Sequence, residues 1–277
     1  MKKSICLSAA IASALGVFVL AGLNTKLLTR RYRVSHPMIK STVKLVYISD
    51  LHNNDYGIEH ELLKAAVEET VPDVVLLGGD IFEVKQPLEP AASFVRWLGA
   101  NYQSFYVTGN HEYYSYRVKE MRQLVTDSQI RVLRGETEVI EVNGNRLSIS
   151  GIDDAEESHV YPSQLVQAHA QRPMEPMFSI LLSHRPEFIE DFLPYGFDLI
   201  LSGHAHGGQW RLPGLINGVF APGQGFFPKY AGGRFDFDQS TLIVSRGLSH
   251  QDQPAPRFYN RPEILVIELV PAESEEE

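Results

Sequence analysis

The chain has 277 residues, of which 44% are hydrophobic, and a formal net charge of -9 at pH 7. This length and composition suffice for one large α/β core, and nothing between residues 40 and 270 has the composition of an interdomain linker. The negative charge argues against a broad nucleic-acid groove, and the single cysteine, Cys6, excludes an internal disulfide. No protein partner is predicted.

The amino-terminal end of the chain is predicted to be a membrane segment. Residues 5–23 carry no charged side chain, and roughly 20 apolar residues can cross a bilayer. We interpret residues 1–34 as an N-terminal membrane anchor or signal segment. An uncleaved single-pass anchor in the cell membrane is favoured because a basic cluster follows the apolar run: Lys26, Arg30, Arg31 and Arg33. The charges on the two sides are too evenly matched to predict the orientation.

Five apolar runs along the chain have the composition of buried parallel strands, and each ends at a residue that can bind a metal. The residues that follow these runs are Asp50, Asp80, Asn110, His184 and His204. In open α/β sheets, ligand-binding loops lie beyond the carboxyl ends of the strands. We therefore expect these five side chains to meet at one edge of the fold and to form a metal site.

Helical patterns separate the first three of these strands. The three residues that end them follow one another at steps of 30 residues, close to the length of one strand-helix-strand unit. The helices are expected at residues 58–70, 90–100 and 115–127. Residues 130–152 instead have the pattern of short strands with a turn at Asn143-Gly144, so a second sheet is expected to begin there.

Neighbouring residues enlarge the set of possible metal ligands. Short motifs at the strand ends add His52, His111 and His206. Two aspartates, one asparagine and four histidines exceed the needs of one ion, with His111 to spare, so the sequence predicts a binuclear site of the kind found in hydrolytic enzymes. Carboxylate, amide and imidazole ligands without thiolate suit divalent manganese, iron, zinc or magnesium, and residue type does not choose among these metals.

Taken in order, these motifs resemble those of a known family. The series Asp-x-His, Gly-Asp, Gly-Asn-His-Glu, His and Gly-His-x-His is similar to that of the calcineurin-like metallophosphoesterases, and the resemblance covers residues 43–270. Within the family, the stretches at residues 203–213, 245–248 and 260–264 look most like the bacterial membrane-anchored, phosphodiesterase-like branch. The resemblance implies an α/β fold: a two-sheet αββα sandwich, here with an N-terminal hydrophobic helix. Residues 271–277 are expected to form an acidic disordered tail.

The family resemblance also implies a role for each residue of the site. One metal would be held by Asp50, His52 and His206, the other by Asn110, His184 and His204, and Asp80 would bridge the two. His111 would contact the phosphate. One position departs from the family pattern, because Glu83 stands where Asp or Asn is usual. This departure leaves the metal ligands in place but puts the orientation of the loop after Asp80 in question.

The implied reaction is hydrolysis of a phosphodiester or phosphomonoester bond by attack of a metal-activated water, with two divalent metal ions as cofactors. His111 is the candidate catalytic residue, placed to donate a proton to the leaving oxygen, with Glu112 or Asp50 orienting it. A small phosphoester is the expected substrate. Two alternatives stay open: a UDP-2,3-diacylglucosamine pyrophosphatase-like hydrolase acting on a lipid-linked pyrophosphate at the membrane, and a non-catalytic scaffold on the same fold.

Three residues outside the main motifs are candidate substrate contacts. Arg185 follows the candidate ligand His184, and Arg246 lies in the Ser-Arg-Gly-Leu stretch. Both arginines suit a phosphate, although an ordinary ion pair is the plainer interpretation of either one. His250 precedes a proline-rich loop that is long enough to reach the edge of the site.

Overall fold

Two six-stranded sheets form the centre of the fold in the computed structural model, which describes residues 2–83, 86–155, 159–250 and 256–272. Across the first sheet the order is β1 (Leu28–His36), β14 (Glu263–Pro271), β2 (Val43–Ile48), β3 (Val74–Gly78), β4 (Ser104–Val107) and β5 (Arg131–Val132). Across the second it is β12 (Gly233–Asp236), β13 (Thr241–Val244), β9 (Leu199–Ser202), β8 (Phe178–Leu182), β7 (Asn145–Gly151) and β6 (Thr137–Val142). A separate pair joins β10 (Phe220–Ala221) to β11 (Gly225–Phe226).

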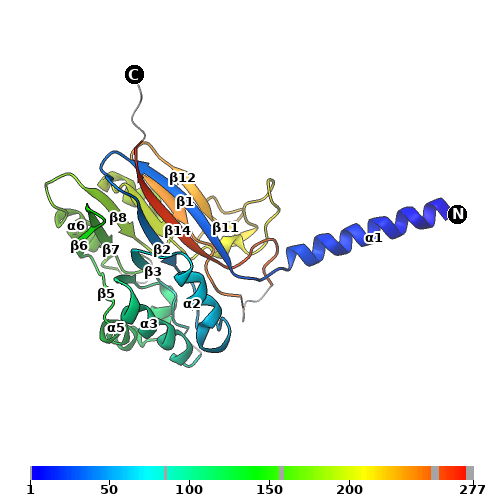
Figure 1. Cartoon of the computed structure of the whole chain (residues 1–277), viewed down its shortest axis with the longest axis horizontal. Helices are drawn as coiled ribbons and strands as arrows, with labels where there is room; N and C mark the ends of the chain where they lie inside the picture. The colour runs from blue at the N-terminus through cyan, green and yellow to red at the C-terminus, as the bar shows by residue number, and fades with distance from the viewer. Residues whose placement is uncertain (1, 84–85, 156–158, 251–255, 273–277) are drawn as a thin grey trace, which may run out of the picture.

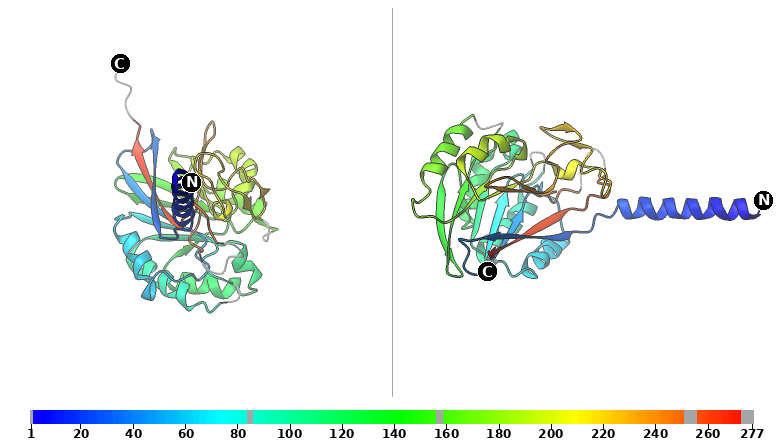
Figure 2. Two further views of the ribbon diagram at one scale, coloured as in Figure 1. Left: turned by 90° about the vertical axis from the view of Figure 1, so that its right-hand side faces the viewer. Right: turned by 90° about the horizontal axis from the view of Figure 1, so that it is seen from above.

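The two sheets pack face to face, and helices cover their outer faces (Figures 1 and 2). One buried cluster joins strands of both sheets, for example Leu45 and Leu76 with Leu147 and Ile180. The outer face of the first sheet packs against α2 (Glu61–Glu68), α3 (Glu89–Asn101) and α5 (Val118–Asp127). That of the second packs against α6 (Tyr161–Ala170) and α7 (Ile189–Phe192). The predicted αββα sandwich is confirmed.

The three helices expected between the first strands are present with small changes. The first is divided into a 3-10 turn, η1 (Ile58–His60), and α2, because Glu59 and His60 have left-handed backbone angles. A short helix, α4 (Asn110–Tyr114), precedes α5. The remaining 3-10 turns are η2 (Pro186–Phe188), η3 (Leu193–Tyr195) and η4 (His206–Gly208).

The register of the parallel strands brings their carboxyl ends to one edge of the fold. In the first sheet, Ile48 pairs with Leu77, and Leu77 in turn pairs with Tyr106. In the second sheet, Leu182 pairs with Leu201. The loops that follow these paired residues therefore start level with one another within each sheet, and the segment expected at residues 130–152 supplies β5 to the first sheet and β6 and β7 to the second.

The N-terminal helix, α1 (Lys2–Gly22), projects from the body of the protein (Figure 1). At its base, the Tyr259 hydroxyl donates a hydrogen bond to the carbonyl oxygen of Phe18 at 2.9 Å. The next element, β1, pairs with β14 along its whole length and crosses the expected boundary at residue 34. At the other end of the chain, residues 273–277 of the expected acidic tail lie outside the described residues.

The prediction of a single-pass membrane anchor is wrong. Within the described part of the chain, no helix is both long enough and apolar enough to cross a membrane. The prediction relied on the length of the run and on its lack of charge. Small residues such as Ser13, Ala14 and Gly16 fill part of α1, and they add little of the apolar surface that makes insertion into a bilayer favourable.

Candidate metal centre

The site lies where five loops from the two sheets meet. Asp50, Asp80 and Asn110 follow β2, β3 and β4 of the first sheet, and His184 and His204 follow β8 and β9 of the second. Five candidate ligands have left-handed backbone angles, which are rare in residues other than glycine: Asp50, His52, Asp80, His204 and His206. Such backbone strain persists only where the surrounding structure enforces it and is concentrated at functional sites.

The candidate ligands form two adjacent groups. In one group, the ligand atoms of Asp50, His52 and His206 all lie within 4.8 Å of one another. The same spacing holds within the second group, Asp80, His184 and His204. Every one of these six side chains is buried, so their polar atoms are held close together with little access to bulk water.

Asp80 belongs to the second group but also faces a histidine of the first. Its Oδ2 is 3.2 Å from Nε2 of His184 and 3.6 Å from Nε2 of His52. Its other oxygen, Oδ1, accepts a hydrogen bond from the backbone N–H of His111 at 2.8 Å. Asp80 thus has one oxygen fixed by the backbone and the other directed at residues of both groups, as a carboxylate shared by two cations requires.

Several buried polar atoms of these residues lack a hydrogen-bond partner among the described residues. They are Oδ2 of Asp50, Nε2 of His52 and Oδ1 of Asn110. Buried polar atoms are rarely left without partners, because desolvation without a compensating bond is costly. Oxygen and imidazole nitrogen are also donors suited to borderline divalent ions, so these residues fit a pair of metal ions.

Hydrogen bonds on the far side of the imidazole rings fix their direction. Nδ1 of His184 donates to the carbonyl oxygen of Gly78 at 2.7 Å, and Nδ1 of His206 lies 2.9 Å from the hydroxyl of Ser249. Both rings therefore present Nε2 to the centre of the site. This arrangement, in which a second partner orients a ligating histidine, is usual at metal centres.

Glu112 joins the two loops that carry Asp80 and Asn110. Its buried carboxylate accepts hydrogen bonds from the backbone N–H groups of Asp80, Ile81, Phe82 and Gly109, at 2.7–3.1 Å. Burial and the nearby charge of Asp80 raise the pKa of Glu112 to about 7. Its bonds go to the backbone of these loops, so Glu112 fixes their positions and is not the partner that orients His111.

Glu83 is the partner that orients His111. Oε2 of Glu83 lies 2.9 Å from Nδ1 of His111 and 3.0 Å from Nδ1 of His52. Burial raises the pKa of Glu83, but the hydrogen bonds from His111 and His52 outweigh this effect and hold the pKa below its ordinary value. The residue that departs from the family pattern therefore acts as a shared support for two histidines of the site.

The charge state of the histidines follows from their surroundings. Burial lowers the pKa of His184, but the charge of Asp80 outweighs it and raises the pKa to about 10. For His204 and His206, burial dominates and holds the pKa well below its ordinary value. Neutral imidazoles can donate a lone pair to a cation without first losing a proton, whereas His184 must release one when a cation binds.

A cavity of about 310 Å³ opens onto the site, and its lining includes Asp80, Asn110, His111, His204 and His206. Arg185 also lines the cavity, where its Nε donates to Oδ2 of Asp154 at 2.9 Å. The other two candidate substrate contacts are not part of the described lining. Arg246 lines a different cavity, and the ring of His250 packs against Tyr56 at 4.8 Å between ring centres.

Some supporting residues were not identified from the sequence. Ser249 and Asp154 are ordinary polar residues in the chain, and no local pattern marks them as partners of His206 and Arg185. Glu112 had a signal, since it ends the Gly-Asn-His-Glu motif. The local sequence does not show that three of its four hydrogen bonds reach back to the loop of Asp80.

Comparison with known proteins identifies the family. The family model for the calcineurin-like phosphoesterases matches residues 43–208. The chain is 28% identical to the metallophosphoesterase YkuE of Bacillus subtilis, covering 82% of this chain and 78% of that protein. It is 26% identical to the phosphodiesterase YaeI of Escherichia coli, covering 82% of each. A Campylobacter jejuni metallophosphoesterase, Cj0846, is 30% identical over 92% of this chain and 67% of its own length.

Solved structures agree on the fold. The NAD nucleotidase of Haemophilus influenzae superposes with a TM-score of 0.53 at 14% identity, covering 76% of this chain and 51% of that one. The Thermus thermophilus protein SoxB gives a TM-score of 0.51 at 15% identity, with 84% and 57% covered. This chain thus spans about half the length of those two proteins, and the likeness concerns the fold alone.

The chain belongs to the calcineurin-like phosphoesterase family. With its clustered aspartates and histidines, which can bind two metal ions, it is a metal-dependent phosphoric ester hydrolase. The predicted family, enzyme class and metal requirement are therefore confirmed.

Proposed function

We propose that this enzyme hydrolyses small phosphodiesters at a binuclear metal centre. The observation that carries the proposal is the position of Asp80, whose Oδ2 lies within 3.2 Å of one histidine group and 3.6 Å of the other. A hydrolase that uses a single ion has no need of a second group of histidines on the same carboxylate. Two adjacent groups that share one carboxylate match a two-metal site.

The ligands are assigned by group. Asp50, His52 and His206 would hold one ion, Asn110, His184 and His204 the other, and Asp80 both. When bound, such a pair of divalent ions lowers the pKa of a water molecule and neutralises the charge of the phosphoryl group. The protein contributes the fixed direction of each ligand, through the Nδ1 partners of the histidines and the backbone bonds accepted by Glu112.

His111 is proposed to give a proton to the leaving oxygen. Burial lowers its pKa, but the charge of Asp80 and the hydrogen bond to Glu83 outweigh this effect and raise the pKa to about 9. Nδ1 of His111 is held by Glu83, and His111 lines the cavity of the metal centre. A proton held at Nε2 beside the scissile bond is what a general acid requires.

Three observations favour a small diester as the substrate. The cavity, about 310 Å³, is of the size of small-molecule sites. The E. coli relative, 26% identical, is named as a phosphodiesterase. The net charge of -9 does not favour a long nucleic acid. Arg185 is the proposed contact to the substrate phosphate from the protein side, since it lines the same cavity as His111.

A substrate panel tests the proposal. The full chain, loaded in turn with manganese, iron, zinc or magnesium, is assayed with a bis-aryl phosphate, an aryl phosphate and UDP-2,3-diacylglucosamine. The highest kcat/KM is expected for the bis-aryl phosphate. A preference for the diacylglucosamine would assign the enzyme to lipid-linked pyrophosphates, and a protein with two bound metals that hydrolyses none of the three would be a scaffold.

A further inference from the structure

A second cavity, of about 550 Å³, lies apart from the metal centre and is lined by three arginines. Arg30 comes from β1, Arg211 follows η4, and Arg246 follows β13. None of these residues lines the cavity of the metal centre in the described structure. Three separate parts of the chain therefore bring guanidinium groups to one place, and we call these three residues the arginine pocket.

The positive charge of the arginine pocket is only partly balanced. Glu263 is fully buried there, 2.8 Å from Nε of Arg30 and 3.7 Å from Nε of Arg246. In the described structure, Arg211 donates hydrogen bonds to neutral oxygens, the carbonyl of Gly207 at 3.2 Å and the side chain of Asn217. Across the described residues, no carboxylate lies within ion-pair distance of Arg211. Three positive charges thus face one negative charge.

The arginines of the pocket also repel one another. Burial and the charge of Arg246 lower the pKa of Arg211 to about 10. For Arg246, burial is again the main effect, and it lowers the pKa. Both guanidinium groups stay protonated at neutral pH, so each would be stabilised by an anion that entered the cavity.

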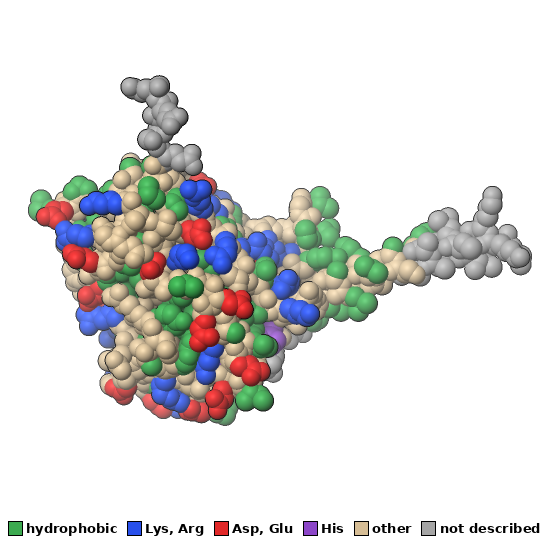
Figure 3. All heavy atoms as spheres, viewed as in Figure 1, with side chains coloured by type: hydrophobic (Ala, Val, Ile, Leu, Met, Phe, Trp, Pro, Cys, Tyr) green, Lys and Arg blue, Asp and Glu red, His purple; other side chains and the backbone are tan. Residues whose placement is uncertain are grey.

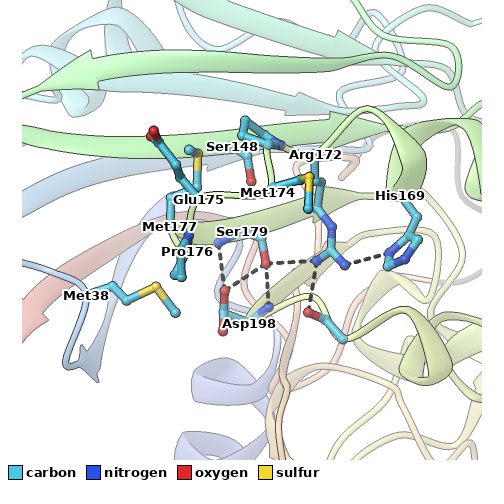
Figure 4. Close-up of a pocket in the computed structure, with 12 residues that line it drawn as sticks. Met38, Ser148, His169, Arg172, Met174, Glu175, Pro176, Met177, Ser179 and Asp198 are labelled. Atoms are coloured by element: carbon cyan, nitrogen blue, oxygen red, sulfur yellow. Dashed lines mark hydrogen bonds between the residues drawn. The ribbon is translucent and has the colours of Figure 1, made fainter.

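A third cavity differs from the arginine pocket, because its arginine has hydrogen-bond acceptors within the protein. It measures about 340 Å³ and is lined by Arg172, and Figure 4 draws the hydrogen bonds of Arg172 to other lining residues. The guanidinium donates to the carbonyl oxygens of Tyr195 at 2.6 Å and Gly196 at 2.9 Å, and it lies 2.6 Å from Nδ1 of His169. In the arginine pocket, Nε of Arg246 is buried without a hydrogen-bond partner among the described residues. The guanidinium of Arg172 thus has acceptors within the protein, whereas Arg246 has a buried N–H group without an acceptor among the described residues.

Apart from Gly214 and Asn217, the rest of the lining is apolar or aromatic. It includes Pro213, Leu215, Ile216 and Tyr259, and Leu215 is exposed. Figure 3 shows Lys and Arg side chains beside apolar ones where α1 meets the body of the protein, and Tyr259 contacts α1 at this junction. A ligand that matches this lining carries a doubly negative group at one end and an organic group at the other.

We propose that the arginine pocket binds the phosphate dianion of a phosphate monoester, at a site distinct from the metal centre. Guanidinium groups match phosphate oxygens in geometry and charge, and two uncompensated positive charges match a dianion. The organic part of the ester lies against Leu215, Ile216 and Tyr259. A free phosphate and the head group of a phospholipid share this chemistry.

Calorimetric titration of the full chain in the presence of EDTA tests the proposal. One arm uses inorganic phosphate, and the other uses dihexanoyl phosphatidic acid below its micelle concentration. The variants are Arg211→Gln and Arg246→Gln, with Arg117→Gln as a matched control, because Arg117 is an exposed arginine paired only with Glu120 in the described structure. Melting temperatures establish that each variant is folded, and Arg211→Lys replaces Arg211→Gln where the latter is not.

Each pocket variant is expected to bind the better ligand about 10- to 100-fold more weakly than the wild type, which is the usual effect of losing one charge-assisted hydrogen bond. The control should bind as the wild type does. The arm with the higher affinity tells a lipid head group from a free phosphate. Absence of binding by the wild type in both arms, or unchanged affinity in the two pocket variants, would overturn the proposal.

Discussion

One carboxylate oxygen of Glu83 holds two histidines of different function, lying 2.9 Å from Nδ1 of His111 and 3.0 Å from Nδ1 of His52. His52 belongs to a candidate metal group, whereas His111 is the proposed proton donor. The position of the donor is therefore tied to the position of a ligand. An aspartate at this position would be one methylene shorter, so the longer side chain allows a single oxygen to reach both rings.

The first prediction concerns Glu83→Gln. A neutral amide keeps one acceptor oxygen but lacks the negative charge, so it holds the two ring N–H groups more weakly than the carboxylate does. We expect turnover and metal affinity both to fall by about 10- to 100-fold, as is usual when the partner of a ligating histidine is removed. Elemental analysis and steady-state kinetics measure the two effects. Glu89→Gln, at an exposed position, is the control. A loss of turnover at full metal affinity would mean that Glu83 supports His111 alone.

The second prediction separates His111 from the metal ligands. His111→Ala and His111→Gln should keep the metal content of the wild type, while turnover falls by roughly 10²- to 10⁴-fold, the usual contribution of general acid-base catalysis. The loss should be greatest for substrates with poor leaving groups, because these need the proton most. Loss of metal would instead place His111 among the ligands, which is the other arrangement that its closeness to His52 and Asp80 permits.

The third prediction concerns the shared carboxylate. Asp80→Asn keeps the shape of the side chain but removes the charge that faces both histidine groups. Two bound ions should then repel each other without compensation, so we expect the variant to bind fewer than two ions per chain and to lose hydrolysis down to the background rate. Metal content is the decisive measurement, with Asp127→Asn on the exposed end of α5 as the control. Two tightly bound ions with normal turnover would remove Asp80 from the bridging role.

The fourth prediction follows from a histidine away from the site. His60 is almost fully buried, and its Nε2 is 2.7 Å from the carbonyl oxygen of Pro90. Burial lowers its pKa below the ordinary value of 6.5. The unfolded chain therefore takes up a proton at His60 before the folded chain does, and this contribution to stability is lost as the pH falls below 6.5. Between pH 7.5 and 5.5, the wild type should lose more unfolding free energy than His60→Gln, and parallel curves would contradict this account.

The positions of the candidate ligands could be predicted because they depend on a local pattern. Each ligand stands just after a buried strand, and parallel strands in register bring such positions together. The same reasoning does not give the direction of a side chain beside a turn. Arg246 is adjacent to Gly247, which abuts Asp50, yet its guanidinium lies next to Glu263 in another cavity. That placement depends on β14, whose pairing with β2 is not written in the local sequence.

The N-terminal region is a second case in which the local sequence does not predict the structure. The sequence predicts that Arg30, Arg31 and Arg33 form the basic flank of a membrane segment. In the structure, residues 28–36 form an edge strand paired with β14, more than 200 residues later in the chain. Tyr32 and Val34 alternate with Arg31, Arg33 and Ser35, and this alternation is the only local sign of a strand. The side chain of Arg30 forms an ion pair with the buried Glu263.

The last prediction tests the role of β1 in the fold with two truncations. Deletion of residues 1–23 removes α1, whose described contacts to the body are with Phe258 and Tyr259, and should change the melting temperature little. Deletion of residues 1–42 also removes β1. It exposes the edge of β14, removes the buried side chain of Val34, and takes away the closest charge partner of the buried Glu263.

Loss of a buried Val and of one member of a buried ion pair should together cost about 3 kcal/mol or more. For a domain of this size, the melting temperature should then fall by roughly 6–12 °C relative to the shorter truncation. Differential scanning calorimetry of both truncations decides the matter. Equal melting temperatures would mean that the fold begins at β2, and that β1 adds nothing to the stability of the sheet.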